Sequence, residues 1–167
     1  MKRYISLFVA LVTMAAWPSL TTAQSGEVRG FAKLRQLVGE WDGADDKGAA
    51  VRASFRLIAG DSALLEVDTF ADSSTTATVY HADMKRVALT HFSRANNQPR
   101  MSADPAAGDP QELDFSFVGA TNLHSTQIGH MHHLLLRFKD DHHFDAVWTW
   151  RHYDQEQTET YHFIRKD

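Results

Sequence analysis

Histidine and tryptophan, whose side chains can bind metals, cofactors or aromatic ligands, are concentrated in one stretch near the C-terminus. Residues 130–152 contain six of the ten histidines and two of the four tryptophans. Apolar and polar residues alternate on both sides of a polar segment at 139–142, which predicts a β-hairpin with one buried face. A three-residue loop at 140–142 would pair Phe138 with Phe144 and Leu134 with Trp148.

The same register predicts a histidine cluster at the end of the hairpin remote from its loop. It places His132 opposite Trp150 and His130 opposite His152, with neighbouring Cβ atoms about 5 Å apart. His130, His132 and His152 could then supply the three protein ligands of an open zinc site, with hydrolysis as its chemistry. The alternative is that these imidazoles hydrogen-bond to loop backbone or solvent at a barrel rim.

A second candidate is His91, which follows Val87 and Leu89 on one face of a predicted strand. That spacing predicts that the imidazole points into the protein, where it either lines a ligand cavity or is satisfied by a buried partner. Either Tyr80 or His81 must face inward on the preceding strand. The turn between the two strands leaves this choice open.

The expected ligand site combines these inward groups with residues near a barrel mouth. Arg100 follows the turn-forming segment 96–99, where its guanidinium could bind a carboxylate of the protein or of an acidic ligand. The acidic residues are expected to point outward, as Asp114 does beside Phe115, or to lie in turns. The ligand-binding set is therefore predicted to be Tyr80, His91, Arg100, His132, Trp148 and Trp150.

The N-terminus has the layout of a secretory signal. A basic start, an apolar run over residues 4–17, Pro18 and the small residue Ala23 predict a signal peptide of residues 1–23 that is cleaved. The apolar run is shorter than the roughly 20 residues of a membrane-spanning helix. We therefore expect one domain, residues 24–167, that is periplasmic or secreted and has no membrane anchor after cleavage.

Composition excludes several kinds of chemistry and partner. The chain has no cysteine, which rules out disulfides, thiol catalysis and thiolate metal ligands. Its formal net charge is −4, and removal of Lys2 and Arg3 makes the mature chain more acidic. A nucleic-acid partner is not expected because such a partner requires a basic surface. Oligomeric state is left open.

One short helix is predicted at 28–37, where Val28, Phe31, Leu34 and Leu37 recur at helical spacing before Gly39. Alternation then predicts about ten strands with hairpin-length connections. Short antiparallel strands joined in this way are best closed into an up-and-down β-barrel, because closure removes unpaired edges. The predicted strands are 40–44, 51–59, 63–71, 76–82, 87–93, 100–103, 112–118, 130–139, 144–152 and 157–165.

The segment Leu37-Val-Gly39-Glu-Trp41-Asp-Gly43, placed directly after this helix, resembles the Gly-x-Trp entry of the calycin superfamily, the lipocalins and their relatives. The stretch from Tyr80 to Met101 is also similar to small secreted lipocalin-like barrels. The resemblance implies a barrel whose floor is closed by Trp41, with Arg165 lying across its ring. The chain departs from lipocalins in having about ten predicted strands, where lipocalins have eight, and no room for a C-terminal helix.

Ten strands also resemble the nitrobindin-like haem barrels, which implies an axial histidine at His162 on the last strand. The cofactor thus stays open between zinc, haem and none. No Gly-x-Ser-x-Gly, phosphate-binding glycine loop or His-Glu-x-x-His occurs, which favours a binding protein over an enzyme. The favoured function is an exported barrel that holds a small, mainly apolar ligand in its interior. A structural barrel with no ligand is the remaining alternative.

Overall fold

The computed structural model describes residues 29–104 and 111–166. The expected signal segment, residues 1–23, and Val28 of the expected helix lie outside this part of the chain. The signal peptide, its cleavage and export therefore stay predictions. Within the described residues, no helix has the length and apolar character that crossing a membrane requires.

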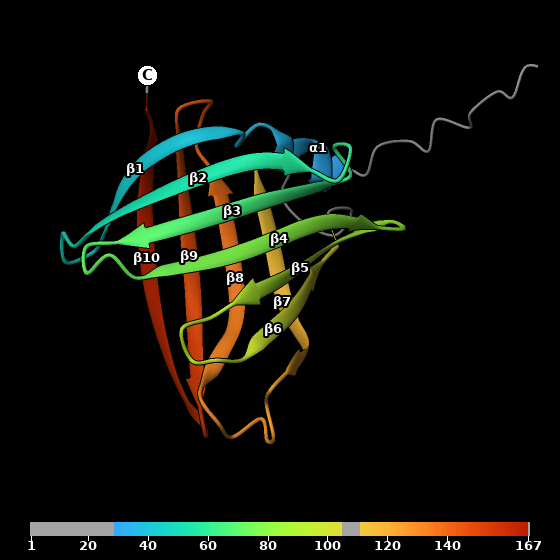
Figure 1. The fold of residues 1–167 in the computed structure, drawn as a ribbon, viewed down its shortest axis with the longest axis vertical. Helices are drawn as coiled ribbons and strands as arrows, with labels where there is room; N and C mark the ends of the chain where they lie inside the picture. The colour runs from blue at the N-terminus through green and yellow to red at the C-terminus, as the bar shows by residue number, and fades with distance from the viewer. Residues whose placement is uncertain (1–28, 105–110, 167) are drawn as a thin grey trace, which may run out of the picture.

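In the described part of the chain, one short helix precedes ten strands, as the sequence predicted (Figure 1). The helix forms where apolar residues recur every three or four positions, and the strands form where they alternate. The elements are α1 (Arg29–Arg35), β1 (Gly39–Asp45), β2 (Ala50–Ile58), β3 (Ala63–Phe70), β4 (Thr75–Asp83), β5 (Arg86–Phe92), β6 (Gln98–Ala103), β7 (Glu112–Thr121), β8 (His130–Phe138), β9 (His143–His152) and β10 (Gln155–Arg165).

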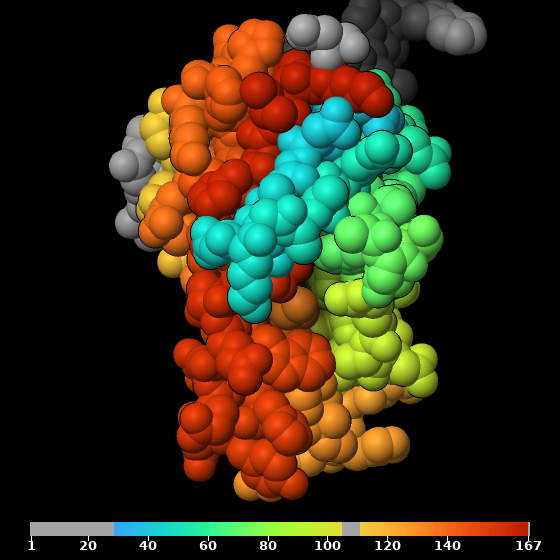
Figure 2. All heavy atoms as spheres, turned by 90° about the vertical axis from the view of Figure 1, so that its left-hand side faces the viewer, coloured from blue at the N-terminus to red at the C-terminus, as the bar shows by residue number. Residues whose placement is uncertain are grey.

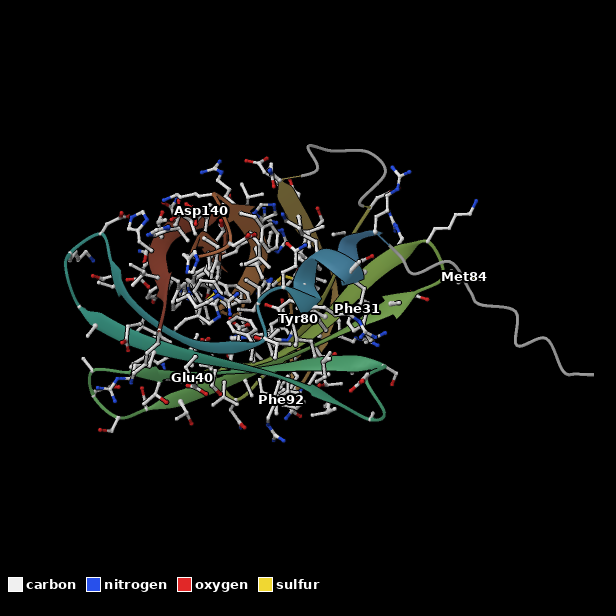
Figure 3. All side chains as sticks on the ribbon, turned by 90° about the horizontal axis from the view of Figure 1, so that it is seen from above. Phe31, Glu40, Tyr80, Met84, Phe92 and Asp140 are labelled. Carbon is white, nitrogen blue, oxygen red and sulfur yellow. The ribbon has the colours of Figure 1, made fainter. Side chains whose placement is uncertain are left out.

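The ten strands form one closed antiparallel barrel, in which each strand pairs with its neighbours in sequence. Pairing of β1 with β10 completes the ring. In Figure 1, strands β2 to β4 cross in front of the more upright strands β8 to β10. The all-β, up-and-down barrel with a short preceding helix is therefore confirmed. Figure 3 shows the consequence for side chains, with Tyr80 inside the ring and Phe92 outside it.

Helix α1 and the start of β1 form one end of the apolar core. Phe31 and Leu34 of the helix are buried, as their spacing predicted. The Trp41 indole Nε1 donates a hydrogen bond of 2.7 Å to the Leu37 carbonyl oxygen. The Arg165 guanidinium lies 4.2 Å from the centroid of the Trp41 ring, as expected from the resemblance to lipocalins. This contact ties the last strand to the first.

The β8–β9 hairpin has the predicted register near its turn. Phe138 pairs with Phe144, and Leu134 with Trp148. All four side chains are buried. The alternation of apolar residues was therefore sufficient to set the register here, because a slip by one residue would have exposed them.

Further from the turn the predicted register is wrong. A β-bulge between Met131 and His133 places Met131 opposite Trp150 and His130 opposite Arg151. The bulge inserts one extra residue, His132, into β8, so every pairing beyond it moves by one position. His130 is consequently not opposite His152, and Met131 takes the inward position that was predicted for His132.

Gly43 is required where β1 meets β10. A Cβ atom at this position would lie 2.6 Å from Cδ1 of Phe163 and 2.7 Å from the carbonyl oxygen of His162. Because the backbone oxygen cannot move without separating the two strands, Gly43→Ala should lower the free energy of unfolding by about 1–3 kcal/mol, measured by chemical denaturation.

Gly119→Ala is the matched control for this substitution. Its Cβ would approach only the mobile end of the Arg100 side chain, at 3.3 Å. We expect a change of less than about 0.5 kcal/mol. Equal destabilisation by the two alanines would contradict the importance of close packing at the β1–β10 seam.

Candidate functional site

Three neighbouring strands place polar side chains in one row inside the barrel. The register sets Glu66 of β3 opposite Thr78 of β4, and Thr78 opposite His91 of β5. All three residues are buried. The Thr78 hydroxyl hydrogen-bonds the His91 ring, with 2.9 Å between Oγ1 and Nδ1. Thr78 therefore lies between a carboxyl group and an imidazole across the sheet.

Two carboxyl groups, those of Glu66 and Asp68, share this inner face of β3. The Tyr80 hydroxyl donates a hydrogen bond of 2.6 Å to Oε2 of Glu66, and the Thr76 hydroxyl donates one of 3.2 Å to Oδ2 of Asp68. Oδ1 of Asp68 is buried and has no hydrogen-bond partner among the residues that the structure describes. Within the described ranges, neither acid forms an ion pair with a lysine or arginine. Neutral hydroxyls hold both groups in place.

Burial shifts the titration of both acids upward. It raises the pKa of Asp68 from 3.8 to about 7, opposed by the hydrogen bond from Thr76. Burial, reinforced by repulsion from Asp68, raises the pKa of Glu66 well above its usual value, against the hydrogen bonds from Tyr80 and Thr78. Removing a carboxylate from water disfavours its charged form. The charge of this wall therefore changes near neutral pH.

His91 presents a neutral imidazole at the same wall. Burial lowers its pKa from 6.5 to about 4. Its ring centroid lies 4.5 Å from that of Trp148. Among the described residues, no group hydrogen-bonds its buried Nε2. Since Nδ1 is engaged by Thr78, Nε2 is left with one donor or acceptor function, depending on the tautomer.

These polar groups form one side of an interior cavity of about 350 Å³. This volume is within the range of small-molecule sites. The opposite side comes mainly from β8, β9 and β10 and is mostly apolar and aromatic. The lining residues are Val51, Glu66, Asp68, Phe70, Thr76, His91, Ser93, Arg94, Ala95, Met131, Ala146, Trp148, Trp150, Glu159, Tyr161 and Phe163.

A second depression of about 430 Å³ adjoins this cavity and shares Met131, Trp148, Trp150 and Glu159 with it. It is also lined by residues 45–47 of the β1–β2 turn and by 157–158 of β10. Figure 2 shows the surface hollowed between the cyan β1–β2 segment, the red C-terminal hairpin and the green strands. The interior cavity therefore lies next to a concave part of the surface.

Four of the six predicted ligand residues lie at or beside the cavity. His91, Trp148 and Trp150 line it. Tyr80 is the inward residue of the pair left open, since it is fully buried while His81 is exposed. Tyr80 does not line the cavity but supports Glu66 from behind through its hydroxyl.

The structure places the other two predicted ligand residues, Arg100 and His132, outside the lining of the cavity. Arg100 is exposed on the outer face of β6 because the adjacent Met101 takes the inward position. His132 lies in the β8 bulge and stacks on Phe117, with 5.1 Å between the ring centroids. Met131 lines the cavity in its place.

The predicted three-histidine cluster does not form. Nε2 of His130 lies 3.2 Å from Nδ1 of His132, but His152 is exposed and packs against Tyr153. The cause is the bulge, which pairs His130 with Arg151. The part of the chain that the structure describes contains no group of three or more His, Cys, Asp or Glu able to hold a metal ion.

His162 is also wrongly placed for the haem interpretation. Its side chain is exposed, and its two ring nitrogens contact carboxylates, Nδ1 at 2.8 Å from Asp145 and Nε2 at 3.0 Å from Asp46. These hydrogen bonds raise the pKa of His162. The neighbouring Phe163 faces inward. An imidazole on the outer face with both nitrogens engaged is not positioned to bind a haem iron inside the barrel.

The sequence analysis missed the inward acids Glu66 and Asp68. The alternation in β3 does not show which face points inward. Leu65 and Val67 make the face that lacks Glu66 and Asp68 the more apolar one. In the barrel, Leu65 and Val67 are half-buried on the outside. The signal that could have resolved the ambiguity is pairing with β4, whose inward Tyr80 lies opposite Leu64.

Comparisons with known proteins find only distant structural similarity. No family model and no curated protein matches the chain. Among solved structures, it is similar to a redesigned β-barrel, mFAP1, described as bound to DFHBI, with 12% identity and a TM-score of 0.33 over 78% of this chain and 96% of that chain. Another DFHBI-bound structure, of EF1p2_mFAP2b, has 9% identity and a TM-score of 0.35 over 80% and 96% of the two chains. Because these sequence identities and TM-scores are low, the candidate site is argued only from the residues of this chain.

Asp68→Asn tests the burial of a titrating acid. Since its folded-state pKa is raised from 3.8 to about 7, the stabilising effect of its proton is present below pH 3.8 and is lost as pH rises to about 7. Asparagine does not titrate. The variant should therefore gain on the order of 2–4 kcal/mol in free energy of unfolding relative to wild type across this window, measured by urea denaturation at several pH values.

Asp83→Asn removes an exposed aspartate from the end of β4 and is the matched control. Its stability should run parallel to that of wild type over the same pH range. Parallel curves for Asp68→Asn and wild type would contradict the raised pKa.

Proposed function

We propose that this protein binds a small, mainly apolar molecule inside its barrel. The apolar body of the ligand packs against Trp148 and Trp150, and its polar group meets Asp68 and His91. One observation carries the proposal, namely an interior cavity of about 350 Å³ with an aromatic wall facing a wall of buried polar groups.

The unpaired atoms on the polar wall support a ligand more than a purely structural barrel. Protein interiors are close-packed and their buried polar atoms are nearly all hydrogen-bonded. Here, Nε2 of His91 and Oδ1 of Asp68 are buried without a partner within the described residues, and both side chains line the same cavity. A ligand that brings its own polar group supplies what these atoms lack.

Because the N-terminal sequence predicts export, we propose that binding takes place in the periplasm or outside the cell. A barrel interior that shields an apolar molecule from water suits a carrier or scavenger in such a compartment. Catalysis is not part of the proposal.

Ala146→Phe tests whether the cavity is the binding site. Ala146 is buried on β9 and lines the cavity, so a phenylalanine would fill much of the space that a ligand needs. We expect the neutral fluorescent probe N-phenyl-1-naphthylamine to bind wild type saturably, and the variant to bind it at least about tenfold more weakly. Probe emission and tryptophan quenching provide the measurement.

Ala82→Phe is the matched control, since Ala82 is exposed at the end of β4. It should bind the probe as wild type does, and an unchanged thermal transition verifies that each variant is folded. Absence of saturable binding to wild type, or equal binding by the two variants, would refute the proposal.

A further inference from the structure

We propose that the ligand of this cavity is an organic cation, in which an apolar or aromatic body carries an amine or quaternary ammonium group. The positive nitrogen would lie against the carboxyl groups of Asp68 and Glu66, and the body against the aromatic wall. This inference rests on the proposed binding function and adds the charge of the ligand to it.

Acidic side chains outnumber basic ones around the cavity, so ionisation of the acids makes it negative. Glu66, Asp68 and Glu159 line it, while Arg94 is its one lining lysine or arginine. The adjoining depression adds Asp45 and Asp46 against the single base Lys47. In a water-poor concave site, an excess of one charge produces a focused potential that attracts ligands of the opposite sign.

Arg94 does not neutralise the acids of the cavity. Its Nη1 donates hydrogen bonds to Oδ2 of Asp72 at 3.3 Å and to Oγ of Ser74 at 2.8 Å. Its guanidinium also lies 4.6 Å from the centre of the Phe70 ring. The positive charge at the cavity edge is therefore directed toward the β3–β4 turn. The carboxyl groups of β3 have no cationic partner among the described side chains.

A buried carboxyl group without a cationic partner is costly when ionised. Within residues 29–104 and 111–166, Oδ1 of Asp68 lacks even a neutral hydrogen-bond partner. A ligand cation would supply the missing charge, whereas a ligand carboxylate would repel both acids. His91, held neutral by its lowered pKa, would not oppose a cation as a protonated imidazole would.

The aromatic wall provides a second attraction for a cation. Trp148, Trp150, Tyr161 and Phe70 line the cavity, and the faces of such rings attract ammonium groups, most strongly when water is excluded. Glu66 and Asp68 come from β3, whereas Trp148, Trp150 and Tyr161 come from β9 and β10 on the other side of the barrel; Phe70 lies on β3 with the acids. A nitrogen between them would contact both.

Binding of a cation should be linked to loss of a proton. The titratable and charged groups around Asp68 are Glu66 on its own strand, Tyr80 on β4, His91 on β5, Arg94 in the β5–β6 turn, and Glu159 and Tyr161 on β10. Below the Asp68 pKa of about 7 the free protein holds a proton there, and a bound cation favours its release. The affinity for a cation should therefore rise with pH, by up to about tenfold per pH unit for each proton released.

The test compares three probes of similar size by isothermal titration calorimetry: trimethyl(2-phenylethyl)ammonium, 3-phenyl-1-propanol and 3-phenylpropionate. The quaternary ammonium carries its charge at every pH, so any pH dependence comes from the protein. We expect the cation to bind at least about tenfold more tightly than the alcohol at about pH 7.5, and the anion more weakly than either. Between about pH 5.5 and pH 6.5 the affinity of the protein for the cation should rise by up to about tenfold, and binding should release a proton into the buffer.

Asp68→Asn should remove most of the advantage of the cation over the alcohol, together with its pH dependence. Glu66→Gln is a second variant with the same expected direction, and Asp83→Asn is the matched control that should keep both properties. The inference is overturned if the alcohol or the anion binds as tightly as the cation, or if Asp68→Asn keeps the preference of wild type. Binding of the neutral probes without a cation preference defeats this inference alone, whereas failure of every probe, N-phenyl-1-naphthylamine included, defeats the binding function as well.

Discussion

Pairing of β1 with β10 closes the sheet, and the interior of the protein exists because of this pairing. At the seam, Trp41 pairs with Arg165, whose guanidinium covers the indole ring and hydrogen-bonds to backbone carbonyls, among them that of Val38 at 2.9 Å. Gly43 allows the Phe163 ring to approach the first strand. Once the ring is closed, alternate residues of every strand must lie inside it, whatever their polarity.

For the acids of β3, Glu66 and Asp68, this constraint places carboxyl groups inside the barrel, where burial disfavours their charged form. Burial raises the pKa of Asp68 to about 7 and lowers that of His91 to about 4. The two groups affect stability in opposite ways, because rising pH destabilises the fold through Asp68 and stabilises it through His91 over part of the same range. An apolar core would avoid both costs. Polar groups that lower stability inside a barrel are typical of a site retained for function.

Sequence reasoning succeeded where local alternation and global closure demand the same arrangement. The short helix, the ten strands, the inward His91 and the Trp41–Arg165 contact follow from spacing or from the lipocalin resemblance. It failed at His132, because a bulge is a local defect in pairing that the hydrophobic pattern does not record.

The sequence-based prediction of inward-facing residues was also wrong at Glu66 and Asp68, for a different reason. The more apolar face of β3 lies outward, since cross-strand pairing with the inward face of β4 decides the orientation. In both places the functional consequence is large. The bulge replaces His132 by Met131 in the cavity, and the orientation of β3 brings two acids into it. The candidate site thus depends on strand pairing, which spacing within one strand cannot provide.

The proposed ligand lies in the cavity between the acids of β3 and the aromatic rings of β9. A crystal structure of the protein with bound trimethyl(2-phenylethyl)ammonium tests this placement most directly. The account predicts the phenyl group against Trp148 and the nitrogen within about 4–6 Å of the Asp68 carboxylate, as direct charge contacts require. Density for the probe outside the barrel only, with the cavity closed by side chains, would contradict the account.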